Sequence, residues 1–326
     1  MRVLISIQQA VHAWQIPAAG VAGLRAQFPD IDFVHATDDA SRARGLRDAE
    51  IAYTWILSTG ELAAAPRLQW LHTSAVAVET LCLPELFAHG VIVSNTRAVQ
   101  SSPIAEHVFA VVLALAKQIP FVLANQQQRH WSQNELVGDR LPWLLKGRTL
   151  GLIGAGTIGS EIARLGAAFG MRVVALTRRG TVDSPHIDQA LAPGDLPALL
   201  DQTDVLVIAA PLTPETLQMI GAAQLAQMKR GALLVNVGRA RIIDHLALAD
   251  AVRSGQVGGA SLDVFHQEPL PSDDPLWALP NVILTPHTSG FRHGHWDDVL
   301  AIFADNLRRY LAGEPVRFRI EPALGY

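Results

Sequence analysis

The stretch of sequence that decides the fold is Leu150-Gly151-Leu152-Ile153-Gly154-Ala155-Gly156-Thr157-Ile158-Gly159. Its first four residues are typical of a buried strand, and an amphipathic helix is predicted from Ile158 to about Phe169. In this context the first glycine permits a tight turn, the second lets a pyrophosphate approach the backbone, and the third lets the helix pack closely on the strand. The N–H groups at the helix N-terminus favour an anion.

We therefore predict a dinucleotide site at this loop, with five binding residues: Gly154, Gly156, Thr157, Ile158 and Gly159. The alternative interpretation is a sharp turn between a strand and a helix that binds nothing. The flanking strand and helix favour the dinucleotide site, because the glycine pattern alone is common in turns.

The end of the next predicted strand, Arg172–Leu176, indicates the type of dinucleotide. NAD-binding sheets carry an Asp or Glu there for the adenine ribose 2′-hydroxyl, whereas this chain has Thr177, Arg178 and Arg179. Guanidinium groups pair well with a 2′-phosphate through charge-assisted hydrogen bonds. We therefore expect these three residues to bind the cofactor and NADP(H) to be preferred over NAD(H). The alternative is that both arginines are solvated and NAD binds through other contacts.

Outward from this motif, short apolar runs alternate with amphipathic segments along the whole chain. This alternation is typical of parallel sheets covered by helices on both faces. The strands expected are Val3–Ile7, Ile31–His35, Ile51–Trp55, Leu68–Thr73, Val91–Ser94, Thr149–Ile153, Arg172–Leu176, Val205–Ala209, Leu233–Val237, Ala260–Val264 and Val282–Thr285. The last six would complete a dinucleotide-binding sheet.

Three helices are expected outside that sheet. The first opens at a serine cap in Ser101-Ser102-Pro103 and ends near Pro120. A second helical stretch runs through Gln126–Trp131. The last helix, about Trp296–Leu311, follows the completed sheet and is expected to return to the first unit.

Composition narrows the class of protein. The 326 residues suggest two domains, and 49% hydrophobic with 17% charged residues excludes a disordered chain. A net charge of −4 offers no basic surface for nucleic acid or an anionic membrane. The longest apolar run, Val108–Ala116, is far below the ~18 residues of a membrane span, and the N-terminal residues do not match a signal peptide. A single cysteine, Cys82, argues against disulfides and a metal site, so we expect a cytoplasmic protein without metal.

Charged side chains follow three of the later predicted strands. Arg239 lies in Asn236-Val237-Gly238-Arg239, Glu268 lies in Leu262 to Pro269, and His287 lies in Thr285-Pro286-His287. Ligands bind at the carboxyl ends of strands in open α/β sheets, so the three side chains are expected to converge on a nicotinamide. Taken singly, they could be a solvated arginine, a turn before proline and a core histidine.

Together these motifs resemble the D-isomer-specific 2-hydroxyacid dehydrogenases, and in particular glyoxylate/hydroxypyruvate reductases. The resemblance covers most of the chain and is strongest over Leu150–Gly290. It includes Ile104-Ala105-Glu106-His107, Pro211-Leu212-Thr213-Pro214-Glu215-Thr216 and Met228-Lys229-Arg230-Gly231-Ala232. It implies a doubly wound α/β fold in which a Rossmann NAD(P)-binding domain, residues 99–291, is inserted into a flavodoxin-like substrate domain, residues 1–98 plus 292–326.

The resemblance also implies roles for individual residues. Arg239, Glu268 and His287 become the catalytic trio. Further cofactor contacts are Pro211, Thr216, Val237, His287 and Asp263, of which Asp263 would orient the nicotinamide. A homodimer is implied as well, with Val108–Ala116 and the segment after it as candidates for its interface.

These residue types suit the reduction of a 2-oxo acid, which adds a hydride to the ketone carbon and a proton to its oxygen. His287 titrates near neutral pH and would donate the proton, while Glu268 would hold the imidazole and favour its charged form. Arg239 would bind the substrate carboxylate and polarise the carbonyl through its fixed fork of donors. The nicotinamide carries the hydride.

The substrate contacts implied are Ala77, Val78, Arg239 and His287. Alanine stands at positions 77 and 240, where the family usually has glycine. No role is assigned to Arg97, Arg241, His293 or His295; the two arginines are either solvated or favour a substrate with a second acidic group. We expect an oxidoreductase that reduces a small 2-oxo acid to a D-2-hydroxy acid, or the reverse. The alternative is a regulatory protein of the same fold that senses the dinucleotide.

Overall fold

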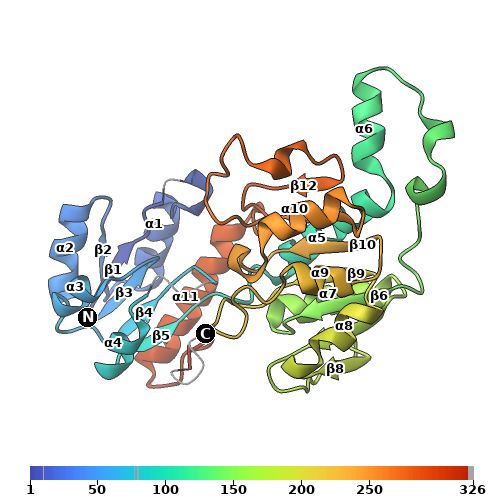
Figure 1. The fold of residues 1–326 in the computed structure, drawn as a ribbon. Helices are drawn as coiled ribbons and strands as arrows, with labels where there is room; N and C mark the ends of the chain where they lie inside the picture. The colour runs from blue at the N-terminus through green and yellow to red at the C-terminus, as the bar shows by residue number, and fades with distance from the viewer. Residues whose placement is uncertain (10, 77, 79–80, 322–326) are drawn as a thin grey trace. The chain divides into compact units, whose positions relative to one another are not determined.

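The computed structural model describes residues 1–9, 11–76, 78 and 81–321 (Figure 1). They form two compact units: one contains Met1–Gln100 and the chain from Phe291 onward, and the other is Ser101–Gly290. These divisions lie within two residues of the expected ones. Since the first unit holds both ends of the chain, the second unit is an insertion into it.

The first unit is built on a sheet of five strands that all pair in parallel. The strands are β1 (Arg2–Ser6), β2 (Asp32–His35), β3 (Ile51–Thr54), β4 (Trp70–His72) and β5 (Ile92–Ser94). Their order, β2-β1-β3-β4-β5, is the flavodoxin-like order. The expected fold class of this unit is confirmed.

Successive side chains of a strand point to opposite faces of the sheet, so buried strands place apolar side chains on both faces. Helices cover each of these faces. The helices are α1 (Ala18–Gln27), α2 (Asp39–Asp48), α3 (Thr59–Ala63), α4 (Leu83–Ala88) and α11 (His295–Leu311). Val3 and Ile5 pack with α1 and α11, whereas Leu4 packs with α2, α3 and α4. The last helix therefore returns to the first unit, as predicted, through buried side chains such as Phe303.

The second unit contains a sheet of seven parallel strands. They are β6 (Thr149–Ile153), β7 (Arg172–Leu176), β8 (Gln189–Leu191), β9 (Val205–Ile208), β10 (Ala232–Asn236), β11 (Val257–Leu262) and β12 (Val282–Leu284). The order is β12-β11-β10-β9-β6-β7-β8. Counted from β6, this is the dinucleotide-binding order 3-2-1-4-5-6 with one more strand at the β12 edge.

Two layers of helices enclose this second sheet (Figure 1). They are α5 (Ser101–Ala116) with α7 (Thr157–Ala168) on one face, and α8 (Leu196–Gln202), α9 (Ala222–Gln227) and α10 (His245–Arg253) on the other. Gly166 brings α7 close to the sheet, since a Cβ atom there would lie 2.6 Å from Leu150 Cδ2. Short 3₁₀ turns complete the two units: His12–Trp14, Gln133–Glu135, Gly138–Arg140, Pro193–Asp195, Ala240–Ile242 and Pro275–Ala278.

Helix α6 (Ile119–Gln127) follows α5 across a sharp bend at Gln118, whose φ is +57°. Within the described residues, no single helix is long and apolar enough to cross a membrane. Among the described helices, the pair α5 and α6 reaches that length and composition together, and the two are bent by 68°.

Three local expectations were wrong. Seven strands form the second sheet instead of six, because the short edge strand β8 has two half-exposed residues and no clear apolar pattern. Pro120 opens α6 instead of ending α5, so the expected helical stretch through Gln126–Trp131 ends at Gln127. The expected serine cap of α5 is also missing, since Ser101 Oγ is buried and has no hydrogen-bond partner among the described residues.

Candidate active site

The glycine loop joins the buried strand β6 to helix α7. Gly154 has a φ of +95°, and a Cβ atom there would lie 2.9 Å from the backbone of Ala210. Only glycine fits this tight and left-handed turn. A Cβ atom at Gly159 would lie 2.1 Å from the carbonyl oxygen of Gly154. Gly159 thus lets α7 start against the loop itself. The glycine pattern predicts that Gly159 lets the helix pack closely on the strand, but Gly166 provides that approach.

Gly156 has a different environment, and it tests whether a dinucleotide fits here. It is exposed at the N-cap of α7, and a Cβ atom built on it meets nothing within 4 Å. The backbone is therefore open beside the first turn of a helix, where amide N–H groups lack partners from a preceding turn. Thr157 is exposed, and Ile158 packs partly into the core. These residues fit the pyrophosphate of a nicotinamide dinucleotide.

The segment after β7 carries the two arginines. Arg178 and Arg179 are exposed, and the Thr177 hydroxyl closes their loop by donating to the carbonyl oxygen of Thr181 at 3.1 Å. The pKa of Glu215 is lowered by a hydrogen bond from Thr213 and further by the positive charge of Arg178.

The charge of Arg178 therefore acts on Glu215, which lies in the turn that follows β9. Within this turn, Thr216 Oγ1 donates to the carbonyl oxygen of Pro211 at 2.8 Å and accepts from the backbone N–H of Thr213 at 2.8 Å. The hydroxyl of Thr216 thus fixes the shape of a segment that contains two predicted cofactor contacts. Val237, a further predicted contact, is buried directly after β10.

Arg239 is held in place by the last residue of β10. The Asn236 side chain donates from Nδ2 to the carbonyl oxygen of Arg239 at 3.0 Å and accepts from the backbone N–H of Gly238 at 3.0 Å. The guanidinium of Arg239 donates from Nη1 to the carbonyl oxygen of Gly238 at 2.8 Å, and the residue is half-buried. Asn236 is thus a positioning residue for Arg239, a role that its place in the motif alone does not indicate.

Glu268 and His287 form a direct pair. Glu268 Oε2 lies 2.8 Å from His287 Nδ1, and Glu268 Oε1 accepts from the backbone N–H of Phe265 at 3.0 Å. Both side chains are accessible, with 39% of Glu268 and 56% of His287 exposed. The carboxylate therefore orients the imidazole through Nδ1, so that Nε2 on the opposite side of the ring is directed away from Glu268.

Asp263 lies underneath this pair and is only 1% exposed. Its carboxylate accepts three hydrogen bonds from the segment after β12: Thr285 Oγ1 at 2.6 Å, the Thr288 N–H at 2.9 Å and the Ser289 N–H at 3.0 Å. His287 lies between these donors with a φ of +55°. Asp263 therefore secures the backbone that presents His287.

Sheet topology brings the predicted trio to one edge. Arg239, Glu268 and His287 follow β10, β11 and β12, which are neighbours in the sheet. Because parallel strands end at the same edge, these residues start from the edge at which the glycine loop follows β6.

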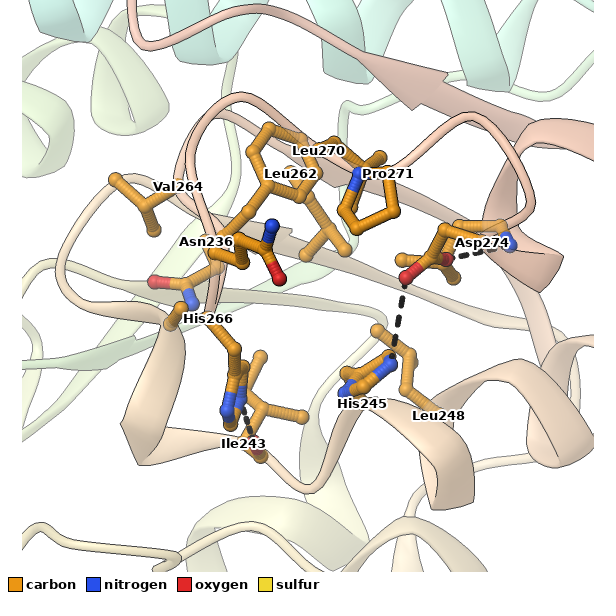
Figure 2. Close-up of a pocket in the computed structure, with 14 residues that line it drawn as sticks. Asn236, Ile243, His245, Leu248, Leu262, Val264, His266, Leu270, Pro271 and Asp274 are labelled. Atoms are coloured by element: carbon orange, nitrogen blue, oxygen red, sulfur yellow. Dashed lines mark hydrogen bonds and ion pairs between the residues drawn. The ribbon is translucent and has the colours of Figure 1, made fainter.

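A cavity of about 200 Å³ lies beside two of these segments (Figure 2). Its lining includes residues just after Arg239 and just before Glu268, but neither Arg239, Glu268 nor His287. His245 faces Asp274 at 3.5 Å across it, and His266 bonds to the carbonyl oxygen of Ile243 at 3.2 Å. This cavity is thus separate from the predicted trio.

The predicted substrate loop belongs to the first unit. Ala77 lies outside the described residues. The side chain of Val78 is 3% exposed and packs in the core, and its carbonyl oxygen accepts from the Leu81 N–H at 3.0 Å. A substrate contact by Val78 would therefore have to use its backbone N–H.

Comparison with known proteins identifies the family of this chain. The model of the D-isomer specific 2-hydroxyacid dehydrogenase NAD-binding domain matches residues 109–289, more than half of the chain. The chain belongs to this family. It is a nicotinamide-dependent oxidoreductase of the 2-oxo acid and 2-hydroxy acid class, which confirms the enzyme hypothesis.

Individual relatives resemble it over most of their length. A glyoxylate/hydroxypyruvate reductase B from Pectobacterium carotovorum is 37% identical over 251 residues, or 77% of this chain and 78% of the relative. A solved family member from Aeromonas salmonicida has a TM-score of 0.83 at 33% identity and covers 98% of this chain and 99% of its own. A family member from Xanthobacter autotrophicus, solved with NADPH and MES, has a TM-score of 0.82 at 29% identity and covers 99% of each chain.

The first two glycines of the loop, Gly154 and Gly156, supply a matched test. We expect Gly156→Ala to leave the melting temperature within about 2 °C of wild type, since its Cβ meets nothing, but to weaken dinucleotide binding at least tenfold. Gly154→Ala should instead lower the melting temperature clearly, because it combines a positive φ with a backbone clash. Thermal melting without ligand and titration of NADPH fluorescence measure the two effects. Unchanged dinucleotide affinity in Gly156→Ala would contradict the site.

Proposed function

We propose that this protein reduces a small 2-oxo acid to a D-2-hydroxy acid with NADPH. The observation that carries the proposal is the 2.8 Å pair between Glu268 and His287, on segments that follow neighbouring strands of a dinucleotide-binding sheet. Arg239, which follows the third neighbouring strand, adds a permanent cation for a carboxylate.

The cofactor and three residues have separate roles in the reaction. The nicotinamide, when bound, supplies the hydride. Glu268 accepts the Nδ1 hydrogen of His287, so the Nε2 proton is the one that His287 delivers to the substrate oxygen. Arg239 pairs with the substrate carboxylate and stabilises the negative charge that develops on the carbonyl oxygen. In the opposite direction, His287 takes the hydroxyl proton as a base.

The catalytic roles can be tested on a panel of glyoxylate, hydroxypyruvate, pyruvate and phenylpyruvate with NADPH and NADH. We expect at least one to be reduced, and His287→Ala to lower kcat by about 10³-fold while NADPH still binds. Arg239→Lys should lower kcat/KM by about 10²-fold, because lysine lacks the fork.

Arg241→Lys is the matched control, since Arg241 is an exposed cation two residues further along. It should stay within about twofold of wild type. Unchanged turnover in His287→Ala would remove that residue from the mechanism, and a panel without any turnover would reject the substrate class.

The preference for NADPH rests on charge at the end of β7. Arg178 and Arg179 are exposed there, and the chain has Thr177 and two guanidinium groups where NAD-binding sheets carry an Asp or Glu, which suits a 2′-phosphate. The relative from Xanthobacter autotrophicus that was solved with NADPH supports the same preference.

Replacing both arginines, Arg178→Ser with Arg179→Ser, should weaken NADPH binding about tenfold or more and change NADH binding little. The control is Arg172→Ser, which removes an exposed arginine from the opposite end of β7. The measurement is the dissociation constant of NADPH and of NADH for the wild-type protein and each variant. Tighter binding of NADH than of NADPH by the wild-type protein would overturn the preference.

We also propose that the protein is a homodimer formed through α6 and the segment after it. Figure 1 shows this region extending from the sheet of the second unit. It exposes large apolar side chains, including Trp131 at 83%, Val137 at 62% and Leu144 at 68%. Apolar surface of this kind is typical of an interface.

Light scattering after size exclusion should therefore give twice the chain mass. The double variant Trp131→Ser with Leu144→Ser should shift the protein toward monomer. Trp277→Ser is the control, because Trp277 is exposed but lies outside this segment. A monomeric wild-type protein, or a variant that stays dimeric, would contradict the proposed interface.

A further inference from the structure

One half-buried titratable group next to the site has no part in the mechanism above. His107 lies on α5, on the face of the second sheet opposite to α10, and it is half-buried. Its Nε2 atom lies 3.3 Å from Thr285 Oγ1. Thr285 is the first residue after β12 and bonds in turn to Asp263.

The direction of these hydrogen bonds follows from what each group can donate. The carboxylate of Asp263 only accepts, so the single hydroxyl hydrogen of Thr285 points to it, at 2.6 Å. The same oxygen must then accept from His107, which places a hydrogen on Nε2. Burial lowers the pKa of His107, and the charge of Asp263 only partly opposes this, so the neutral form of the ring is favoured.

This chain of donors reaches the backbone of His287. A residue other than glycine is disfavoured at a φ of +55°, because its Cβ atom crowds the backbone, so the surrounding contacts must hold His287 there. Here the contacts are the N–H groups of Thr288 and Ser289 on Asp263, and the bond from the His287 N–H to the carbonyl oxygen of Thr285 at 2.9 Å. Thr285 therefore helps to hold the backbone of His287 through both its hydroxyl, which bonds to Asp263, and its carbonyl oxygen.

We propose that His107 is a positioning residue for His287, acting through Thr285 and Asp263. By donating to Thr285, the neutral imidazole keeps the hydroxyl directed at Asp263 and so keeps the segment from Thr285 to Ser289 in its left-handed turn. The inference rests on the proposed catalytic role of His287. It also makes a claim about backbone order that holds without turnover.

Substitutions of His107 separate its hydrogen bond from its packing. His107→Leu removes the donor, whereas His107→Gln retains an N–H donor near the position of Nε2 without a titrating ring. We expect His107→Leu to lower kcat about fivefold with little change in the dissociation constant of NADPH. His107→Gln should regain most of the lost rate.

A second readout uses the cofactor-free protein. Amide hydrogen exchange of Thr288 and Ser289 should be about fivefold faster in His107→Leu and near the wild-type rate in His107→Gln. Thr285→Val should speed the same amides, since it removes the link between His107 and Asp263. In a Thr285→Val background, His107→Leu should add nothing further, because the two residues act in one chain.

The outcomes distinguish this proposal from the proposed function. Wild-type exchange in His107→Leu, or an equal effect of His107→Leu with and without Thr285→Val, would overturn the positioning role. If the wild-type protein reduces no 2-oxo acid, the proposed function fails while the exchange measurement still decides the role of His107. If His107→Leu does not fold, unchanged exchange in Thr285→Val would overturn the proposal.

Discussion

The parallel direction of every strand is the constraint on which the site depends. A parallel sheet ends all its strands at one edge, so segments that are distant in sequence start from the same side. In the second unit, β10, β11 and β12 are neighbours and are followed by Arg239, Glu268 and His287. The glycine loop follows β6 at the same edge. The parallel sheet alone therefore places the cofactor loop and the reactive groups at the same edge, independently of side-chain contacts.

Two carboxylates at this edge of the sheet have different roles, the buried Asp263 and the accessible Glu268. Asp263 is buried, and a charge out of water is tolerated only when hydrogen bonds satisfy it. Its three donors all come from one short segment, so the need for satisfaction fixes the conformation of that segment. Glu268 is accessible, and an exposed pair contributes little to stability. Its contribution is to orient the imidazole of His287.

Much of the fold could be predicted where the sequence pattern is strong. The structure shows two strands with the predicted bounds, Thr149–Ile153 and Arg172–Leu176. Both are fully or almost fully buried apolar runs, and glycine or arginine near their ends marks where the runs stop. The pattern was too weak at Gln189–Leu191, an edge strand of three residues. The sequence does not predict the bend before α6, because the bend depends on a left-handed backbone conformation at Gln118. Glutamine rarely adopts this conformation.

The candidate site shows the same division. The sequence by itself determined the glycine loop, the arginines after β7 and the order of Arg239, Glu268 and His287, because these depend on residue types at fixed distances from recognisable strands. Only the tertiary structure decided that Asn236 holds Arg239, that Gly159 packs on Gly154, and that His107, Thr285 and Asp263 form one chain beneath His287. The physical reason is that hydrogen bonds depend on distances of a few ångströms between residues up to 178 positions apart, and packing alone sets those distances.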